Sequence, residues 1–127
     1  EKLKMMDTFF SNPSGLEKNY STVVDLFLLA SSLIQRFPEF YKRFSVKKFS
    51  LSGGKGINRN ELLSLPGFDG IKTGYTKRAG YCLVASRVKE GKRIMAIILG
   101  AETNIDRFLY VKNVLQSSTW KKILGEI

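Results

Sequence analysis

A lysine, a threonine and a glycine follow one another in the middle of the stretch Asp69–Thr76. A lysine, a hydroxyl residue and a glycine in a row (Lys72, Thr73 and Gly74) are unusual for a core strand, and they favour a strand that lines a site. The alternative is an edge strand whose lysine discourages pairing with other chains. The residues around this stretch decide between the two interpretations.

Two runs with strand character follow the lysine stretch, at Tyr81–Val88 and Arg93–Leu99. The dipeptide Glu90-Gly91 between them is a hairpin signal, and Thr76–Gly80 is a tight connection. The sequence therefore predicts a three-stranded antiparallel meander that begins with the lysine strand. With the helices predicted on either side, this is an α+β fold.

A first helix is predicted from a cap at Ser21 or Thr22, with Asp25 placed to return the capping hydrogen bond. Pro38 ends this helix or starts a short second one. Its apolar positions, at a helical period, are Val23, Leu26, Phe27, Ala30, Leu33, Ile34 and Phe37. A last helix is predicted over Asn104–Gln116. Its apolar face consists of Ile105, Phe108, Leu109, Val111 and Leu115.

The remaining segments carry weaker signals. Glu1–Met6 is interpreted as the last turns of a helix, and Asp7–Tyr20 as a loop whose apolar residues pack on the fold. Ser45–Leu51 has the character of a short strand before the turn at Gly53-Gly54, and Asn58–Leu63 is a turn into one helical turn.

Composition limits the chemistry. The chain of 127 residues has no histidine, which excludes a Ser-His-Asp or Cys-His site and any histidine metal site within it. If the site carries out nucleophilic catalysis, lysine is the candidate general base. We expect neither a metal nor a cofactor. The single cysteine, Cys82, cannot form an internal disulfide and is expected to be a small buried residue. No apolar run is long enough to span a membrane.

The net charge of +10 predicts attraction to polyanions. The basic residues are scattered, without a helix face that interleaves them with aromatic residues. We therefore expect no specific recognition of nucleic acid.

The pattern around the lysine strand resembles the serine D-alanyl-D-alanine carboxypeptidases, which are low-molecular-mass penicillin-binding proteins. The matching residues are Asp69–Thr76, Ala79–Ser86, Ile98–Ala101 and Arg107, together with Asn58-x-Asn60-x-Leu62-Leu63, Ser21-Thr22-x-x-Asp25, Met6-x-Thr8-x-Phe10 and Asn12-Pro13-x-Gly15-Leu16. The resemblance implies a β-lactamase/transpeptidase-like fold. It identifies residues 1–127 as the C-terminal portion of one catalytic domain.

The resemblance also implies a reaction. In this family a serine attacks the carbonyl between two D-alanines of the peptidoglycan stem peptide, and water releases the acyl-enzyme. Penicillin acylates the same serine, so both the stem peptide and β-lactam antibiotics are implied ligands. The location is implied to be extracytoplasmic, in the periplasm or on the wall face of the membrane.

Site residues follow from the resemblance, position by position. Lys72 brings positive charge into the cleft, the hydroxyl of Thr73 donates to the terminal carboxylate, and Gly74 leaves room for the peptide. The backbone N–H of Tyr75 is one donor of the oxyanion hole, while its side chain flanks the cleft or packs. Thr76 is a candidate hydroxyl behind the site.

Arg107 is implied to help bind the D-alanine carboxylate through its guanidinium group. The alternative is an arginine on the helix surface that pairs with Glu102 or Asp106.

Two of the family's three motifs are missing. Ser-x-Asn does not occur. Ser-x-x-Lys occurs at Ser45/Lys48, Ser52/Lys55, Ser86/Lys89 and Ser118/Lys121, but none of these pairs lies in the apolar helix that the motif needs. We therefore expect the chain alone to be inactive. We also expect its sheet to show an unpaired edge and an uncovered apolar face. This predicts that the isolated chain is unstable or has a partner, the missing N-terminal half of the domain.

Two rival hypotheses remain open. A serine β-lactamase also carries Lys-Thr-Gly before a strand meander. A non-catalytic basic module that binds anionic wall polymers or nucleic acid is a hypothesis of a different class, and it rests on the net charge alone.

Overall fold

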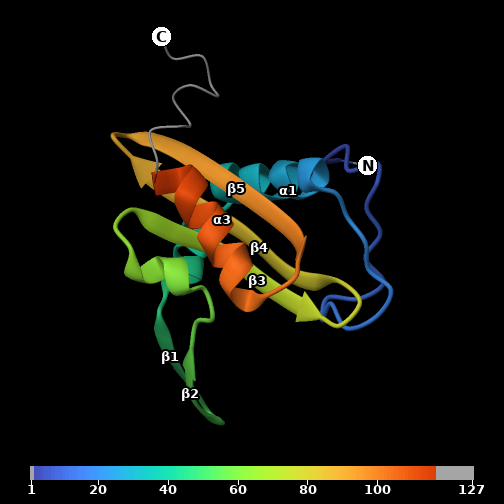
Figure 1. Ribbon diagram of the computed structural model, residues 1–127, viewed down its shortest axis with the longest axis horizontal. Helices are drawn as coiled ribbons and strands as arrows, with labels where there is room; N and C mark the ends of the chain where they lie inside the picture. Colours follow the sequence, from blue (N-terminus) through green and yellow to red (C-terminus); the bar gives the residue numbers. More distant parts are fainter. Residues whose placement is uncertain (1, 117–127) are drawn as a thin grey trace.

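The centre of the molecule is an antiparallel sheet, seen in a computed structural model that describes residues 2–116 (Figure 1). Its strands are β3 (Phe68–Thr76), β4 (Gly80–Lys89) and β5 (Lys92–Ala101), in the order β3-β4-β5. The predicted meander is thus confirmed. Within residues 2–116, the outer edges of β3 and β5 have no strand partner, as expected.

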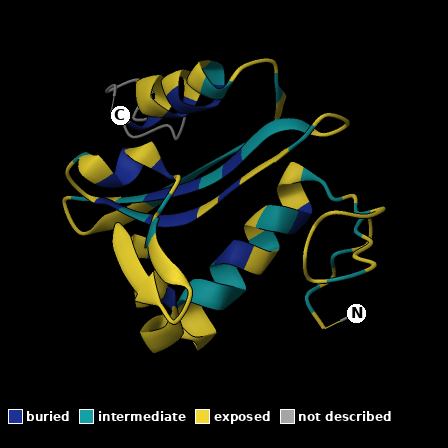
Figure 2. Ribbon diagram, turned by 90° about the horizontal axis from the view of Figure 1, so that it is seen from below, coloured by how far each residue is buried: buried dark blue, intermediate teal, exposed yellow. Residues whose placement is uncertain are grey.

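Two helices lie on opposite faces of this sheet, α1 (Val23–Arg36) on one and α3 (Asn104–Gln116) on the other (Figure 2). None of the helices in the described part of the chain is long and apolar enough to cross a membrane. Under α3 the core is formed by Leu62, Phe68, Leu83, Ala85, Phe108, Val111 and Leu115. A second cluster under α1 is formed by Ala30, Tyr41 and Ile71.

Helix α3 has the predicted bounds, but not the whole predicted face. Phe108, Val111 and Leu115 are buried against the sheet. Ile105 and Leu109 are 72% and 46% exposed, so their predicted burial is wrong. The helix meets the sheet along a narrow stripe of positions three and four apart, and these two residues lie beside that stripe.

The start of α1 differs from the predicted capping box. The Thr22 hydroxyl accepts from the backbone N–H of Asp25 at 3.1 Å, as expected. The Asp25 carboxylate instead accepts from the backbone N–H of Asp7 at 3.0 Å and from the hydroxyl of Thr8 at 2.6 Å. It therefore fastens the N-terminal loop to the helix, which accounts for the burial of this acid.

The N-terminal segment is not helical. Residues 2–3 and 6–7 form turns, and Lys4 between them has a φ of +55°, which is incompatible with a right-handed helix. Reciprocal backbone hydrogen bonds between Phe9 and Tyr20 close the loop that follows. The predicted packing of this loop is wrong for Phe9, Phe10 and Leu16, which are 49%, 53% and 79% exposed.

Short elements connect α1 to the sheet: α2 (Pro38–Tyr41), the 3-10 helix η1 (Lys42–Ser45), β1 (Lys48–Leu51), β2 (Gly54–Ile57) and the 3-10 helix η2 (Glu61–Ser64). Strands β1 and β2 form a hairpin that projects from the body of the molecule (Figure 1). Its base is held by Asn58, whose side-chain amide donates to the carbonyls of Phe44 and Val46 at 3.2 and 3.1 Å.

Much of the apolar surface of α1 is uncovered. Val23, Val24 and Phe27 are 47%, 64% and 48% exposed, and Figure 2 shows the helix as largely exposed or half-buried. Among the described residues, the uncovered apolar face that was expected on the sheet is found instead on α1, because α1 and α3 cover the two faces of the sheet.

Candidate functional site

The candidate site is built on β3, where exposure alternates along the strand. Lys72 and Gly74 are exposed, and Thr73 between them is buried, with 8% exposure. A Cβ added to Gly74 would meet only the Cβ of Cys82, at 3.9 Å, so packing does not require glycine here. The missing side chain instead keeps the surface beside Lys72 open. This is what a ligand that lies along the strand would need.

Lys72 lies in an electropositive environment. Its ammonium group donates to the carbonyl of Thr73. The residue is exposed, but the protein removes part of the water around its ammonium group. This desolvation is the first cause that lowers the pKa of Lys72, and the positive charges of Arg59 and Arg107 are the next. The site therefore contains a third cation, Arg59, that was not predicted from the sequence.

The position of Arg59 is set by the residues on either side of it. The side chain of Asn60 is almost fully buried and donates to the carbonyl of Gly70 on β3 at 3.1 Å. It also accepts from the backbone N–H of Leu62 at 3.3 Å, which caps η2. Asn58 fastens the other side to η1. The sequence signal that could have indicated Arg59 is the asparagine on each side of it. Buried amides often fix the backbone of a connecting segment through hydrogen bonds.

Arg107 reaches from the first turn of α3 to the sheet, and its side chain is buried, with 5% exposure of the residue. Its Nη1 donates to the carbonyls of Gly74 at 3.0 Å and Cys82 at 3.3 Å. Its Nη2 donates to the side chain of Asn104. The guanidinium also lies over the ring of Phe108, 4.8 Å from its centroid. Arg107 thus joins α3 to β3 and β4 at the predicted site.

The alternative role for Arg107, pairing on the helix surface, is wrong. Asp106 accepts from the hydroxyl of Thr103 at 2.7 Å instead. Burial is the first cause of the lowered pKa of Arg107, and Glu61 opposes that shift. Its Nε has no hydrogen-bond partner among residues 2–116. The positive charge of Arg107 also acts on Lys72, whose pKa it helps to lower.

The two other predicted residues have local contacts. The ring of Tyr75 stacks on Tyr81 with 4.2 Å between centroids and is 56% exposed, so it both packs and borders the site. The hydroxyl of Thr76 accepts from the backbone N–H of Ala79 at 3.0 Å and holds the turn between β3 and β4. The oxyanion role of the Tyr75 N–H stays a prediction.

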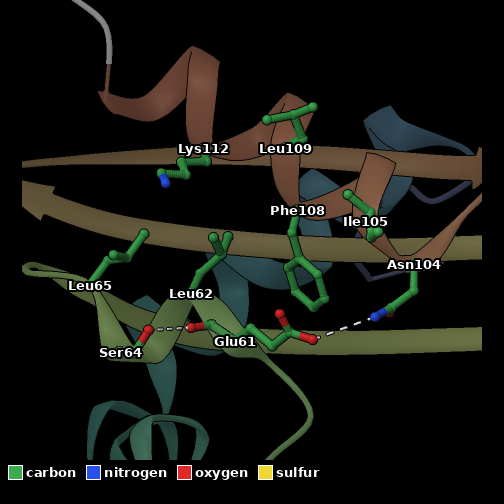
Figure 3. Close-up of a pocket in the computed structure, with 9 residues that line it drawn as sticks. All are labelled: Glu61, Leu62, Ser64, Leu65, Asn104, Ile105, Phe108, Leu109 and Lys112. Atoms are coloured by element: carbon green, nitrogen blue, oxygen red, sulfur yellow. Dashed lines mark hydrogen bonds between the residues drawn. The ribbon is translucent and has the colours of Figure 1, made fainter.

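A groove of about 360 Å³ lies between η2 and α3 (Figure 3). At one end the carboxylate of Glu61 accepts from the side chain of Asn104 at 3.4 Å, and the same asparagine holds Arg107. None of the predicted site residues lines the groove. The lining residues are Glu61, Leu62, Ser64, Leu65, Asn104, Ile105, Phe108, Leu109 and Lys112.

The Ser-x-x-Lys pairs do not supply a nucleophile within the described residues. Ser86 is fully buried and accepts from Arg93. The hydroxyl of Ser45 donates to the carbonyl of Lys42 at 2.7 Å, at the end of η1. Ser52/Lys55 lies at the tip of the projecting hairpin. The pair Ser118/Lys121 lies outside the described residues.

Comparison with known proteins gives concordant results. The family described as D-alanyl-D-alanine carboxypeptidase matches residues 1–103. The carboxypeptidase DacD of Salmonella typhimurium is 36% identical over 120 residues, which cover 91% of this chain and 31% of that protein. DacF of Bacillus subtilis is 35% identical, with the same coverage. The chain thus spans about a third of the length of these relatives.

Solved structures agree in fold. Penicillin-binding protein D2 of Listeria monocytogenes, in its ampicillin-bound form, matches with a TM-score of 0.84 and 38% identity, over 91% of this chain and 50% of that chain. Penicillin-binding protein 5 of Haemophilus influenzae matches with a TM-score of 0.85 and 35% identity, over 91% and 35%. The predicted penicillin-binding-protein fold is confirmed as a partial domain. This chain belongs to the D-alanyl-D-alanine carboxypeptidase family.

Proposed function

We propose that this chain forms one wall of the active site of a serine D-Ala-D-Ala carboxypeptidase. The enzyme removes the terminal D-alanine from peptidoglycan stem peptides through an acyl-enzyme, and penicillin acylates it at the same serine. One observation carries this proposal. Lys72 lies on β3, Arg107 donates to Gly74 of the same strand, and the outer edge of β3 is unpaired within residues 2–116. A peptide that ends in a carboxylate fits such an edge because it offers both backbone hydrogen bonds and an anion.

Each residue of this wall then has a task. The peptide pairs with the edge of β3 and passes over Gly74, where no side chain intervenes. The charges of Lys72 and Arg107 attract its terminal carboxylate, and the Thr73 hydroxyl donates to that group. The backbone N–H of Tyr75 donates to the oxyanion, which is worth about 3–4 kcal/mol in the transition state.

The lowered pKa of Lys72 suits a group that exchanges protons during the reaction. Burial and two neighbouring cations make its charged form less favourable than that of an exposed lysine. The lysine therefore gives up its proton more readily than an exposed lysine does.

The nucleophilic serine is supplied from outside this chain. In support, the described Ser-x-x-Lys pairs have other structural roles, and the exposed apolar residues of α1 need a cover. An N-terminal half of the domain provides both the serine and the cover. The substrate is a wall component, so the enzyme acts on the extracytoplasmic side of the membrane.

Fluorescent penicillin tests this function. We expect a covalent, heat-stable adduct on the complete polypeptide that contains this chain, and none on the 127-residue chain alone. An adduct on the isolated chain would contradict the external nucleophile. Rapid release of hydrolysed penicillin by the complete polypeptide would favour the β-lactamase hypothesis instead. Absence of both outcomes, with salt-dependent polyanion binding that K72A and R107A leave unchanged, would favour the basic binding module.

A further inference from the structure

Four polar side chains meet at the start of β3, outside the group of cations described above. Asp69 accepts from the hydroxyl of Tyr41 at 3.0 Å. Nη1 of Arg93 donates to Oδ1 of Asp69 at 2.9 Å and forms an ion pair with Oδ2 at 2.8 Å. The same nitrogen of Arg93 donates to Tyr41 at 3.3 Å and to the buried hydroxyl of Ser86. This set, the Asp69 cluster, connects α2 to all three strands of the sheet.

The cluster lies where the strand pairing is irregular. Phe68 pairs with Arg87 and Gly70 pairs with Ser86, so the register of β3 against β4 shifts between Phe68 and Gly70. Asp69 is the extra residue of this bulge and has no ladder partner. Its side-chain bonds therefore hold the strand at the point where the ladder does not.

Further contacts hold the next residue from both sides. A Cβ added to Gly70 would lie 2.6 Å from the hydroxyl of Tyr41, so that hydroxyl rests directly against the backbone. The carbonyl of Gly70 accepts from the side chain of Asn60 at 3.1 Å. Both contacts occur two residues before Lys72.

A bulge sets the phase of every residue that follows it, because a shift by one residue turns each side chain to the opposite face. We infer that Asp69, held by Tyr41 and Arg93, is a positioning residue that fixes the phase of β3 and so places Lys72 and Thr73 for reaction. The catalytic part of this inference rests on the proposed function. The structural part concerns the strand alone.

The ion pair between Arg93 and Asp69 is partly buried, so we expect its loss to have a measurable effect. The side chains of Arg93 and Asp69 are 29% and 28% exposed, whereas those of the surface pair Lys42–Glu39 are 71% and 83% exposed. Removal of one partner from a partly buried pair leaves the other without compensation, but an exposed pair contributes little. E39Q is therefore a matched control for D69N and R93Q.

The first test measures labelling of the complete polypeptide at increasing concentrations of fluorescent penicillin. We expect D69N and R93Q each to lower the limiting labelling rate at least tenfold, with a smaller change in the half-saturating concentration. The double variant D69N/R93Q is expected to be no slower than the slower single variant, and E39Q to remain within twofold of the unmodified protein. Limiting rates within twofold for D69N and R93Q, with lowered melting temperatures, would overturn the positioning role.

The second test measures amide hydrogen exchange and does not depend on activity. D69N is expected to raise the exchange of residues 71–75 at least tenfold relative to α3, while E39Q leaves it unchanged. Unchanged or uniformly raised exchange would overturn the inference. If the unmodified polypeptide is not labelled by penicillin, the proposed function fails, and the exchange measurement still decides whether the Asp69 cluster fixes the strand.

Discussion

Replacement of Arg107 by methionine tests whether this arginine holds the site together. R107M keeps an unbranched side chain of similar helix propensity, but removes the donors to the carbonyls of Gly74 and Cys82 and to the side chain of Asn104. Each hydrogen bond from a charged group contributes about 1.5 kcal/mol at the low end, so three contribute about 4.5 kcal/mol.

Part of this loss is recovered. The buried Nε of Arg107 lacks a partner among residues 2–116, and its removal relieves roughly 1–2 kcal/mol of desolvation cost. The net expectation is a fall of about 3 kcal/mol in the free energy of unfolding, which is a large share of the stability of a small domain.

Urea unfolding of the complete polypeptide that contains this chain measures this difference. R78M is the matched control because Arg78 is exposed in the turn between β3 and β4, and we expect it to change stability by less than about 0.5 kcal/mol. An R107M variant as stable as R78M would refute the reasoning, since the bonds from Arg107 to the sheet would then contribute nothing.

Two further predictions concern β3. Burial, Arg59 and Arg107 lower the pKa of Lys72, so its charge destabilises the fold, and K72M should raise the unfolding free energy at pH 7. This gain should vanish as the pH rises past the ordinary value of 10.5, where neither state is charged; a K72M variant that is less stable at every pH would contradict it. G70A should cost about 1–3 kcal/mol, because its Cβ would meet the Tyr41 hydroxyl at 2.6 Å. Y41F should restore part of that loss in urea unfolding, and no restoration would contradict the contact.

Local signals in the sequence were sufficient for the elements that surround the site. The runs with strand character and the turn residues between them predicted the three-stranded meander. The helical period predicted α1 and α3, with a cap before α1. These features depend on residues within a few positions of one another. The same is true of Lys72, Thr73 and Gly74, whose types and order indicated the site before any geometry was known.

Contacts between distant segments could not be predicted in this way. Asp25 binds Asp7 and Thr8 rather than its own cap, and Arg107 donates to Gly74, 33 residues away. The role of Arg59 depends on a hydrogen bond from the neighbouring asparagine to β3. Such pairings follow from how the layers stack, and no short spacing in the sequence encodes them.

The central claim is that β3 binds the carboxylate end of a ligand whose acyl group is attached to a serine outside this chain. A crystal structure of the complete polypeptide after reaction with ampicillin tests it most directly. We predict that the ligand lies along β3, with its carboxylate within hydrogen-bond distance of the Thr73 hydroxyl and its acyl bond to a serine outside residues 1–127. An acyl bond to a serine of this chain, or a carboxylate directed away from Lys72 and Thr73, would contradict the account.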